Sequence, residues 1–393
     1  MLIYNIVKAE LCISIICLIV KGKKMKLIFN KEQLINAINI VSKAISGKTT
    51  NPLMECVLFD ASFDKVLLSA SDLEIGIETK VEANIVEDGK IALEAKLVYD
   101  IVRKLDAQDY DITIEADAAY NTIISSNNAI FKIQGFDPEE FNYLPKIEKN
   151  QHIKLNQFTL KEVIRQTIFS VSLTDSNKMM SGVLFDINED IARFVALDGH
   201  RISIRNVKLK ESYEQIKVVV PSKTLSELAR IISSNNDKEI NIYFADNYIL
   251  FEFDDTIVLS RLMEGEYFKI EHMLSSDYKT KINVNRLKLL NAIDSSMILI
   301  RENDHKPIIL DMRDSSMELR MKSSYGSMKN AIDCNKSGDD LVIAFNPKFF
   351  IDALKVIDDE KVDMFFSNPK APCYIRDTEN NYLYIILPVN FIE

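Results

Sequence analysis

Three stretches of the sequence share one pattern: KLIFNKEQLINAINIVSKAI at residues 26–45, HIKLNQFTLKEVIRQTIFSV at residues 152–171 and KTKINVNRLKLLNAIDSSMI at residues 279–298. Each has a short alternation of apolar residues, then a turn containing Asn, Gln or Arg, and then apolar residues at helical spacing. Leu34, Leu160 and Leu287 take matching positions in this alignment. Each stretch therefore predicts a strand followed by a helix, repeated three times along the chain.

A second set of similar stretches lies between the first three: GKIALEAKLVYDIVRKL at residues 89–105, IKVVVPSKTLSELARII at 216–232 and DLVIAFNPKFFIDALKVI at 340–357. Lys96, Lys223 and Lys348 match, each at the start of a predicted helix. The chain is thus six half-units of one helix plus several alternating strands. We predict an α+β fold of three repeated domains, with helices packed on antiparallel sheets. The expected domains are residues 25–148, 149–275 and 276–393.

Residues 1–24 do not belong to this repeat. The apolar run Leu11–Val20 is ten residues long, whereas a membrane-spanning helix needs about 20. Its lysines follow the run, whereas a signal peptide places them before it. Because Met25 opens the first repeat, we expect residues 1–24 to be a start-site artefact. A weak membrane anchor, in a membrane-attached structural protein, is the alternative.

The charge of the chain is unevenly distributed. Lys and Arg number 48 against 58 Asp and Glu, a net charge of −10. Five of the six predicted helices are nevertheless net positive. These cations could simply cover solvated helix faces. If the six helices instead face one surface, that surface is weakly basic and suits loose, non-sequence-specific contact with an enclosed duplex.

Catalytic signatures are missing from the sequence. It has no phosphate-binding glycine loop, no G-x-S-x-G and no Cys or His spacing for a metal. Five scattered cysteines fit a reducing cytoplasm. We expect a cytoplasmic binding protein without catalysis, cofactor or metal. A metal-dependent nucleic-acid-processing enzyme remains the alternative, because carboxylates distant in sequence can meet in space.

Two further motifs stand out. Leu197-Asp198-Gly199-His200-Arg201-Ile202 lies between two predicted strands and is either a tight turn or an exposed donor site. The segment 384–391, YIILPVNF, is apolar although chain ends are usually polar and frayed. Such a segment either docks in its own core or forms part of a binding groove.

Four segments together carry a family resemblance: SGVLF at residues 181–185, FVALDGHR at 194–201, YIILPV at 384–389 and DLE at 72–74. With the threefold repeat, residues 25–391 resemble the bacterial sliding clamp, the β subunit of DNA polymerase III. The resemblance implies a head-to-tail homodimeric ring with helices inside and sheets outside. Such a ring is a processivity factor that slides on double-stranded DNA. Its partners would be the replicative polymerase catalytic subunit, the clamp loader, and repair and translesion proteins carrying clamp-binding peptides, with no membrane involved.

The resemblance also assigns site residues. It implies a partner-peptide pocket made by Met180, Leu197, Gly199, His200, Arg201, Ile202, Phe268, His272, Met273, Asn346, Phe349, Ile385, Ile386, Leu387, Pro388 and Val389. One wall departs from the family, because residues 267–270 read YFKI where F-P-D-Y is frequent. The DNA-facing residues would be Lys48, Lys96, Arg103 and Lys223. The dimer interface would contain Phe131, Ile133, Met297 and Ile298.

Overall fold

The computed structural model describes residues 25–45, 47, 49–106, 111–172, 174, 177–274, 277–301, 306–379 and 381–391. The chain divides into two compact units. Unit 1 joins the chain up to His152 to the segment Ile240–Arg261, and unit 2 joins Ile153–Glu239 to Leu262–Glu393. The middle third of the chain therefore contributes to both units.

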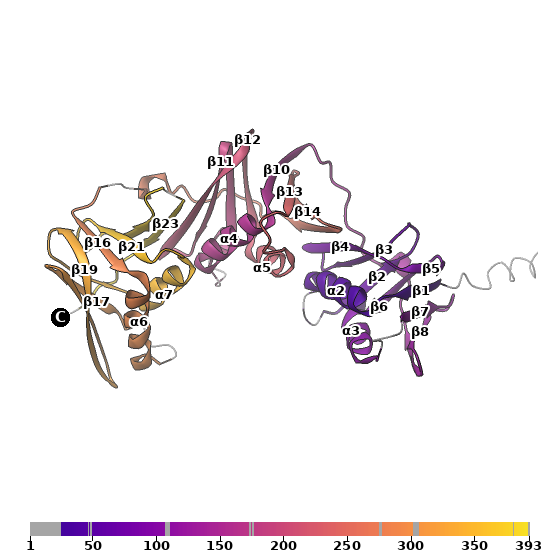
Figure 1. The fold of residues 1–393 in the computed structure, drawn as a ribbon. Coiled ribbons are helices and arrows are strands. Elements are labelled where there is room, and N and C mark those ends of the chain that lie inside the picture. The colour runs from indigo at the N-terminus through magenta and orange to yellow at the C-terminus, as the bar shows by residue number, and fades with distance from the viewer. Residues whose placement is uncertain are drawn as a thin grey trace, which may run out of the picture. The chain divides into compact units, whose positions relative to one another are not determined.

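Unit 1 combines two antiparallel strand arrays with helices α2 and α3, which pack against each other (Figure 1). One array has the order β5-β1-β7-β8-β9, and the other runs β13-β14-β15-β4-β3-β2-β6. The elements are β1 (Met25–Phe29), α2 (Lys31–Val41), β2 (Cys56–Asp60), β3 (Val66–Ser71), β4 (Ile75–Val81), β5 (Asn84–Glu87), β6 (Lys90–Glu94), α3 (Ala95–Lys104), β7 (Ile112–Ala116), β8 (Asn121–Ser126), β9 (Ala129–Gln134), β13 (Glu239–Phe244), β14 (Tyr248–Phe253) and β15 (Thr256–Arg261).

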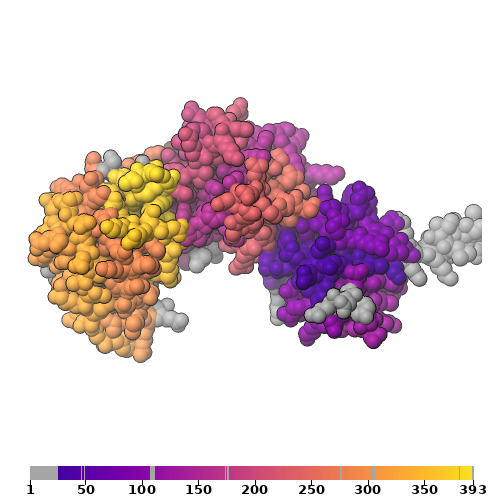
Figure 2. All heavy atoms as spheres, in the orientation of Figure 1, coloured from indigo at the N-terminus to yellow at the C-terminus, as the bar shows by residue number. Residues whose placement is uncertain are grey.

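Unit 2 is built around a ten-stranded antiparallel sheet of order β11-β12-β23-β22-β21-β16-β19-β18-β17-β20. In Figure 2 the last residues of the chain, in yellow, lie against the orange segments that precede them. The elements are β10 (Gln151–Asn156), α4 (Gln157–Thr167), β11 (Gly182–Leu197), β12 (Arg201–Pro221), α5 (Ser222–Ile231), β16 (Thr280–Asn285), α6 (Arg286–Ser296), β17 (Ile308–Arg313), β18 (Ser316–Ser323), β19 (Gly326–Gly338), β20 (Leu341–Phe345), α7 (Pro347–Val356), β21 (Lys361–Phe366), β22 (Cys373–Arg376) and β23 (Tyr382–Ile386).

The helices begin where the sequence repeat predicts them. Asn30 and Asn285 cap α2 and α6 by accepting hydrogen bonds from backbone N–H groups of the first turn. Four residues after the cap, Leu34 and Leu289 are fully buried. The predicted match of Leu287 is therefore wrong by two residues, and Leu287 is 54% exposed. Aligned on their caps, Asn30 and Asn285, the two helices place Leu34 and Leu289 at the same inward position.

The second set of helices confirms its alignment. Lys96, Lys223 and Lys348 are each the second residue of their helix, in α3, α5 and α7. Within unit 2, α4 contacts α5 and α6 contacts α7. The α+β class and the repeated arrangement of helices and antiparallel strands are confirmed.

Candidate binding pocket

Unit 2 holds an open cavity of about 430 Å³ on one face of its sheet. Strands β11, β12, β22 and β23 supply its floor, and the segment 268–273 supplies a wall. Ten of the sixteen predicted pocket residues line it: Met180, Leu197, Gly199, Arg201, Ile202, Phe268, His272, Met273, Ile385 and Leu387. Four further residues line it: Lys269 and Ile270, which belong to the predicted wall 267–270, and Pro372 and Tyr374, which were not predicted. The cavity is mainly apolar, with cationic groups near its rim.

Strand alternation decides which part of the C-terminal strand faces the cavity. Ile385 and Leu387 line it, whereas Ile386 points to the opposite face and packs in the main core of unit 2. Tyr374 lies opposite Ile385 in the neighbouring strand and therefore shares its face. The alternation within CYIR at residues 373–376 could have identified Tyr374 once its strand partner was known.

The loop that joins β11 to β12 explains the unusual 197–202 motif. Its two central residues are Gly199 and His200, and the Asp198 carboxylate accepts hydrogen bonds from the backbone N–H of His200 at 3.0 Å and of Arg201 at 3.1 Å. Gly199 has φ +86°, a left-handed conformation that a side chain disfavours. The motif is thus a tight turn that also forms one rim of the cavity.

Arg201 is the best-connected side chain of this region. It is only 8% exposed. Its guanidinium donates to Asp198 at 3.0 Å, to Asp352 of α7 at 2.7 Å and to the backbone oxygen of Phe169 at 2.6 Å. It also stacks over the Phe349 ring, 4.6 Å from the centroid. Arg201 therefore fixes the hairpin loop of the cavity to helix α7.

The remaining predicted pocket residues lie next to the cavity without lining it. The His200 ring stacks on Phe349 with centroids 6.0 Å apart. Asn346 caps α7 by accepting from the Lys348 N–H at 3.0 Å. Pro388 is half-buried, and the Val389 N–H donates to the Ala344 oxygen at 2.9 Å. These residues hold α7 and the chain end against the cavity.

The wall that departs from the family pattern is folded into the core. The Tyr267 hydroxyl donates to the Val195 backbone oxygen at 3.2 Å, and burial raises the pKa of Tyr267. Ile270 is buried, while Phe268 packs edge-on against Tyr267 with ring centroids 5.8 Å apart. The side chains of Phe268 and Ile270 thus line the cavity as an aromatic and an aliphatic surface.

The predicted DNA-facing residues lie on helices of both units. Lys96 and Arg103 are exposed on α3, where Arg103 pairs with Asp100 at 3.3 Å. Lys223 is exposed near the start of α5. Lys48 lies outside the described residues. The structure thus leaves three of these cations accessible to solvent.

The predicted interface residues lie at two separate edges. Phe131 and Ile133 are on β9, which is the edge strand of its sheet. Met297 and Ile298 form a short 3-10 turn after α6, close to the start of β19. Ile298 is 84% exposed and Phe131 is 40% exposed. Both edges therefore leave apolar side chains in contact with solvent.

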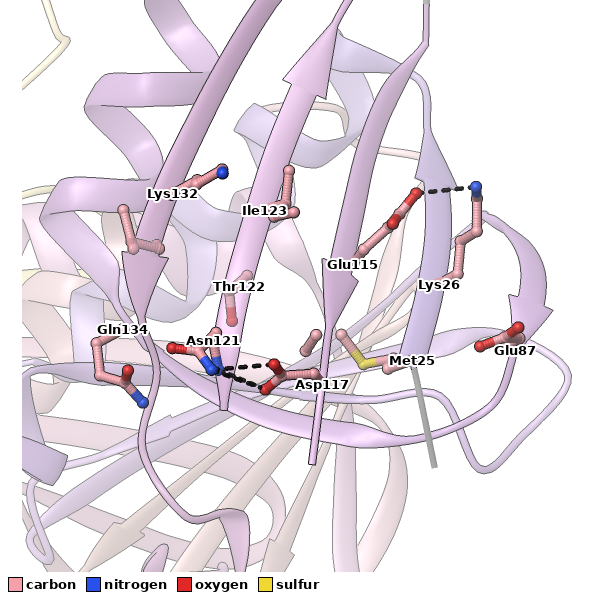
Figure 3. A pocket seen from close by; sticks show the side chains of 12 residues that line it. Met25, Lys26, Glu87, Glu115, Asp117, Asn121, Thr122, Ile123, Lys132 and Gln134 are labelled. Carbon is pink, nitrogen blue, oxygen red and sulfur yellow. Dashed lines mark hydrogen bonds and ion pairs between the residues drawn. The ribbon is translucent and has the colours of Figure 1, made fainter. Parts of the chain in front are cut away.

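A second, more polar cavity of about 700 Å³ lies at the β9 edge of unit 1 (Figure 3). Lys26, Glu115, Ile123 and Lys132 form a row across four strands of its floor. Lys26 and Glu115 form an ion pair at 2.8 Å.

No cluster of three or more His, Cys, Asp and Glu side chains in the described part of the chain could hold a metal ion. No helix among the described residues is long and apolar enough to cross a membrane.

The repeated half-units and the apolar pocket beside a hairpin loop define a DNA clamp fold. Family models of the N-terminal, central and C-terminal domains of the DNA polymerase III beta subunit match residues 25–145, 154–269 and 271–390. The chain therefore belongs to the DNA polymerase III beta subunit family, the bacterial sliding clamps.

Relatives and solved structures agree with this assignment. A beta sliding clamp of Staphylococcus aureus is 32% identical, over 93% of this chain and 99% of the relative. A crystal structure assigned as a DNA polymerase III beta subunit of Eubacterium rectale is 53% identical, with a TM-score of 0.91 and coverage of 93% and 99%. The Bacillus subtilis DNA polymerase sliding clamp is 31% identical, with a TM-score of 0.90 and coverage of 94% and 100%. These matches support a DNA polymerase processivity factor and give no support to the metal-dependent enzyme.

Proposed function

We propose that two copies of the chain close head to tail into a ring that encircles duplex DNA and tethers a replicative DNA polymerase. In this proposal the ring slides without sequence preference, performs no catalysis, needs no cofactor and works in the cytoplasm. Tethering acts by raising the effective concentration of the polymerase at its template. One observation carries the proposal. Each unit contains one junction at which strands from successive repeats pair, β4 with β15 and β12 with β23. Two further strand edges, on β9 and β19, fit a third junction of the same kind.

The two formed junctions have the same register. In unit 1, Leu259 of β15 lies opposite Gly76 of β4. In unit 2, Ile385 of β23 lies opposite Ile202 of β12. Gly76 and Ile202 correspond, because each is the second residue after a two-residue hairpin loop. Strands β18 and β19 form a third hairpin of this kind. Its last pair is Ser323 and Gly326, so Ser327 takes the position of Gly76 and Ile202.

The partner for this third hairpin is β9. Its sheet matches four inner strands of the ten-stranded sheet residue for residue. Leu27, Ile114, Ile124 and Phe131 pair in succession, as Ile282, Met364, Ile375 and Tyr384 do. Lys132 therefore corresponds to Ile385. Within the described residues, β9 pairs only with β8, and Gly326–Asp333 pairs only with β18. We infer that Lys132 of one copy lies opposite Ser327 of the other.

Side-chain contacts support the same closure. In unit 2, Phe169 packs on Tyr384 with ring centroids 5.7 Å apart. Phe169 is the middle residue of the 3-10 turn Ile168–Ser170, as Ile298 is of Met297–Leu299. Ring closure would place Ile298 of one copy on Phe131 of the other and cover both. Closure also removes two open strand edges that would otherwise promote aggregation.

Cysteine cross-linking tests the register. Directly opposed residues of antiparallel strands lie within disulfide range, whereas residues four apart along a strand do not. In chains with Cys12 and Cys17 replaced by Ser, we expect Lys132→Cys with Ser327→Cys to give covalent dimers under mild oxidation. The matched control combines Lys132→Cys with Ala331→Cys and should remain uncross-linked. Equal cross-linking of both pairs, or none, would contradict the proposed closure.

Topological binding to DNA is tested by comparing two templates. After loading by a clamp loader, a ring should stay on nicked circular DNA and leave linear DNA through its ends. The exposed positions of Lys96, Arg103 and Lys223 support loose phosphate contact. Equal retention on both templates would show that direct contacts, not encirclement, hold the DNA.

The apolar cavity of unit 2 is our proposed site for partner peptides. A polymerase-derived peptide would place apolar side chains against Ile202, Ile385 and Leu387. Leu387→Lys should lower its affinity at least about tenfold, because a charge then faces the apolar ligand. Val389→Lys is the matched control, since Val389 lies two residues on and outside the cavity lining. Isothermal titration with the peptide measures both, and equal losses would place the binding site elsewhere.

A further inference from the structure

The cavity at the β9 edge is the counterpart of half of the pocket in unit 2. Its floor includes Asn121, Ile123, Lys132 and Gln134 (Figure 3). By the ladder correspondence, these residues take the positions of Pro372, Tyr374, Ile385 and Leu387. All four of the latter line the pocket in unit 2. The same backbone geometry therefore carries apolar walls in one place and polar walls in the other.

The missing half of this counterpart would come from the second copy. In unit 2, Leu197, Ile202 and Ile385 form one row across three strands on the pocket floor. In a closed ring the corresponding row is Lys322 and Ser327 of one copy beside Lys132 of the other, because Lys322 pairs with Ser327 as Leu197 pairs with Ile202. An apolar row is thus replaced by Lys, Ser and Lys.

The charges around this row leave two ammonium groups to be neutralised. Lys132 and Lys322 are exposed, and neither forms an ion pair within the described residues. Two nearby carboxylates have cationic partners, because Glu115 binds Lys26 at 2.8 Å and Glu318 binds Lys329 at 2.8 Å. Asp117 accepts a hydrogen bond from the neutral amide of Asn121 at 2.9 Å and keeps its charge, but it follows β7, two strands away from Lys132 on β9. Of the charged cavity residues, Glu87 lies farthest from β9, on the other side of β1.

We propose that the closed ring binds an oxyanion of the phosphate type at each seam, between Lys132 of one copy and Lys322 of the other. This inference rests on the proposed ring. The Ser327 hydroxyl, between the two lysines, donates a third hydrogen bond to the anion. Charge-assisted hydrogen bonds from both copies then strengthen closure, whereas without the anion the two ammonium groups repel each other.

Sedimentation equilibrium of the full chain tests the site, with inorganic phosphate as the probe. We expect phosphate to lower the dimer dissociation constant about fivefold or more relative to chloride at equal pH and ionic strength. A dimer with the same dissociation constant in both salts would overturn the anion site alone. A chain that stays monomeric in both salts would overturn the ring and the site together.

Variants separate this site from the general salting-out effect of phosphate. Lys132→Gln and Lys322→Gln should each abolish the difference between the two salts. In chloride they should dimerise at least as tightly as the original chain, because the repulsion is gone. Lys208→Gln, at an exposed lysine of β12, is the control and should keep the full phosphate effect. Retention of that effect by Lys132→Gln would refute the assignment.

Discussion

The strand junctions of unit 1 and unit 2 have the same register, but the first is covered by a side chain and the second is open. In unit 1, a side-chain Cβ at Gly76 would lie 1.8 Å from Cδ2 of Leu144, so the chain's own leucine occupies that space. In unit 2, the corresponding position is Ile202, and the surface above it is open as a cavity. The two junctions thus differ in how the following segment packs: Leu144 fills the space over Gly76, whereas the segment 268–273 forms a wall beside Ile202.

The largest expected effect on stability comes from a buried ion pair that, among the described residues, only one of the two junctions contains. Arg201 of unit 2 corresponds to Ile75 of unit 1, so a buried guanidinium stands at one junction where an aliphatic side chain stands at the other. Arg201→Gln removes one partner of a buried pair and should destabilise unit 2 by roughly 3–5 kcal/mol. Hydrogen exchange of β11 and β12 amides measures this.

Arg165→Gln is the control for that variant. Arg165 is more exposed and pairs with Glu162 and with Asp358, so its loss should cost less than about 1 kcal/mol. Equal effects of the two variants would show that the network around Arg201 does not support the junction.

The covering leucine gives the next largest effect. Leu144→Ala should destabilise unit 1 by about 2 kcal/mol, because it removes apolar contacts and leaves a gap over Gly76. Gly76→Ala should be destabilising by itself and tolerated in the Leu144→Ala background. Urea unfolding of the two single variants and the double variant gives the coupling. Additive losses would contradict the steric explanation.

The hairpin loop of unit 2 should be sensitive to a single methyl group. Gly199→Ala forces a side chain into a left-handed backbone and should cost about 1 kcal/mol in thermal unfolding of unit 2. Gly47→Ala is the matched control, because no positive φ is required there and nothing lies within 4 Å of the added Cβ. A loss at Gly47 as large as that at Gly199 would exclude the backbone explanation.

The smallest effect should be a dependence of unit 1 stability on pH. Burial raises the pKa of Glu78, which corresponds to Ile204 in unit 2. The ionised carboxylate therefore disfavours folding at neutral pH, and this cost disappears as pH falls through the raised pKa. Glu78→Gln should stabilise unit 1 at pH 7 and change little at pH 4.

Asp60 provides a comparison of opposite sign. Burial alone would raise its pKa, but hydrogen bonds from Lys90 and Ser62 outweigh it and lower the pKa. Its stabilisation is present above the unfolded value and is lost as pH falls through the lowered one. Asp60→Asn should therefore destabilise unit 1 at pH 7, and stabilisation there would contradict this reading.

The sequence was sufficient for the repeat but not for all of the pocket. Alternation and helical spacing predicted helices α2 to α7, but the alignment failed at Leu287. Leu287 and Leu289 lie two residues apart, and only the cap Asn285 identifies Leu289 as the match of Leu34. Pocket residues carried by a motif, such as Leu197 and Gly199, were found. Pro372 and Tyr374 were missed because only strand pairing brings them beside Ile385, and pairing between distant segments leaves no local signal. His200 and Asn346 were also predicted as pocket residues, but they lie beside the cavity and not in its lining.

The position of β23 between β12 and β22 has a consequence for synthesis. Strand β12 leaves the ribosome long before β23, so its edge remains unpaired while the residues in between are translated. Until β23 arrives, that edge of β12 presents unpaired backbone groups to other strands. The pocket, our proposed site for partner peptides, is therefore among the last surfaces to form.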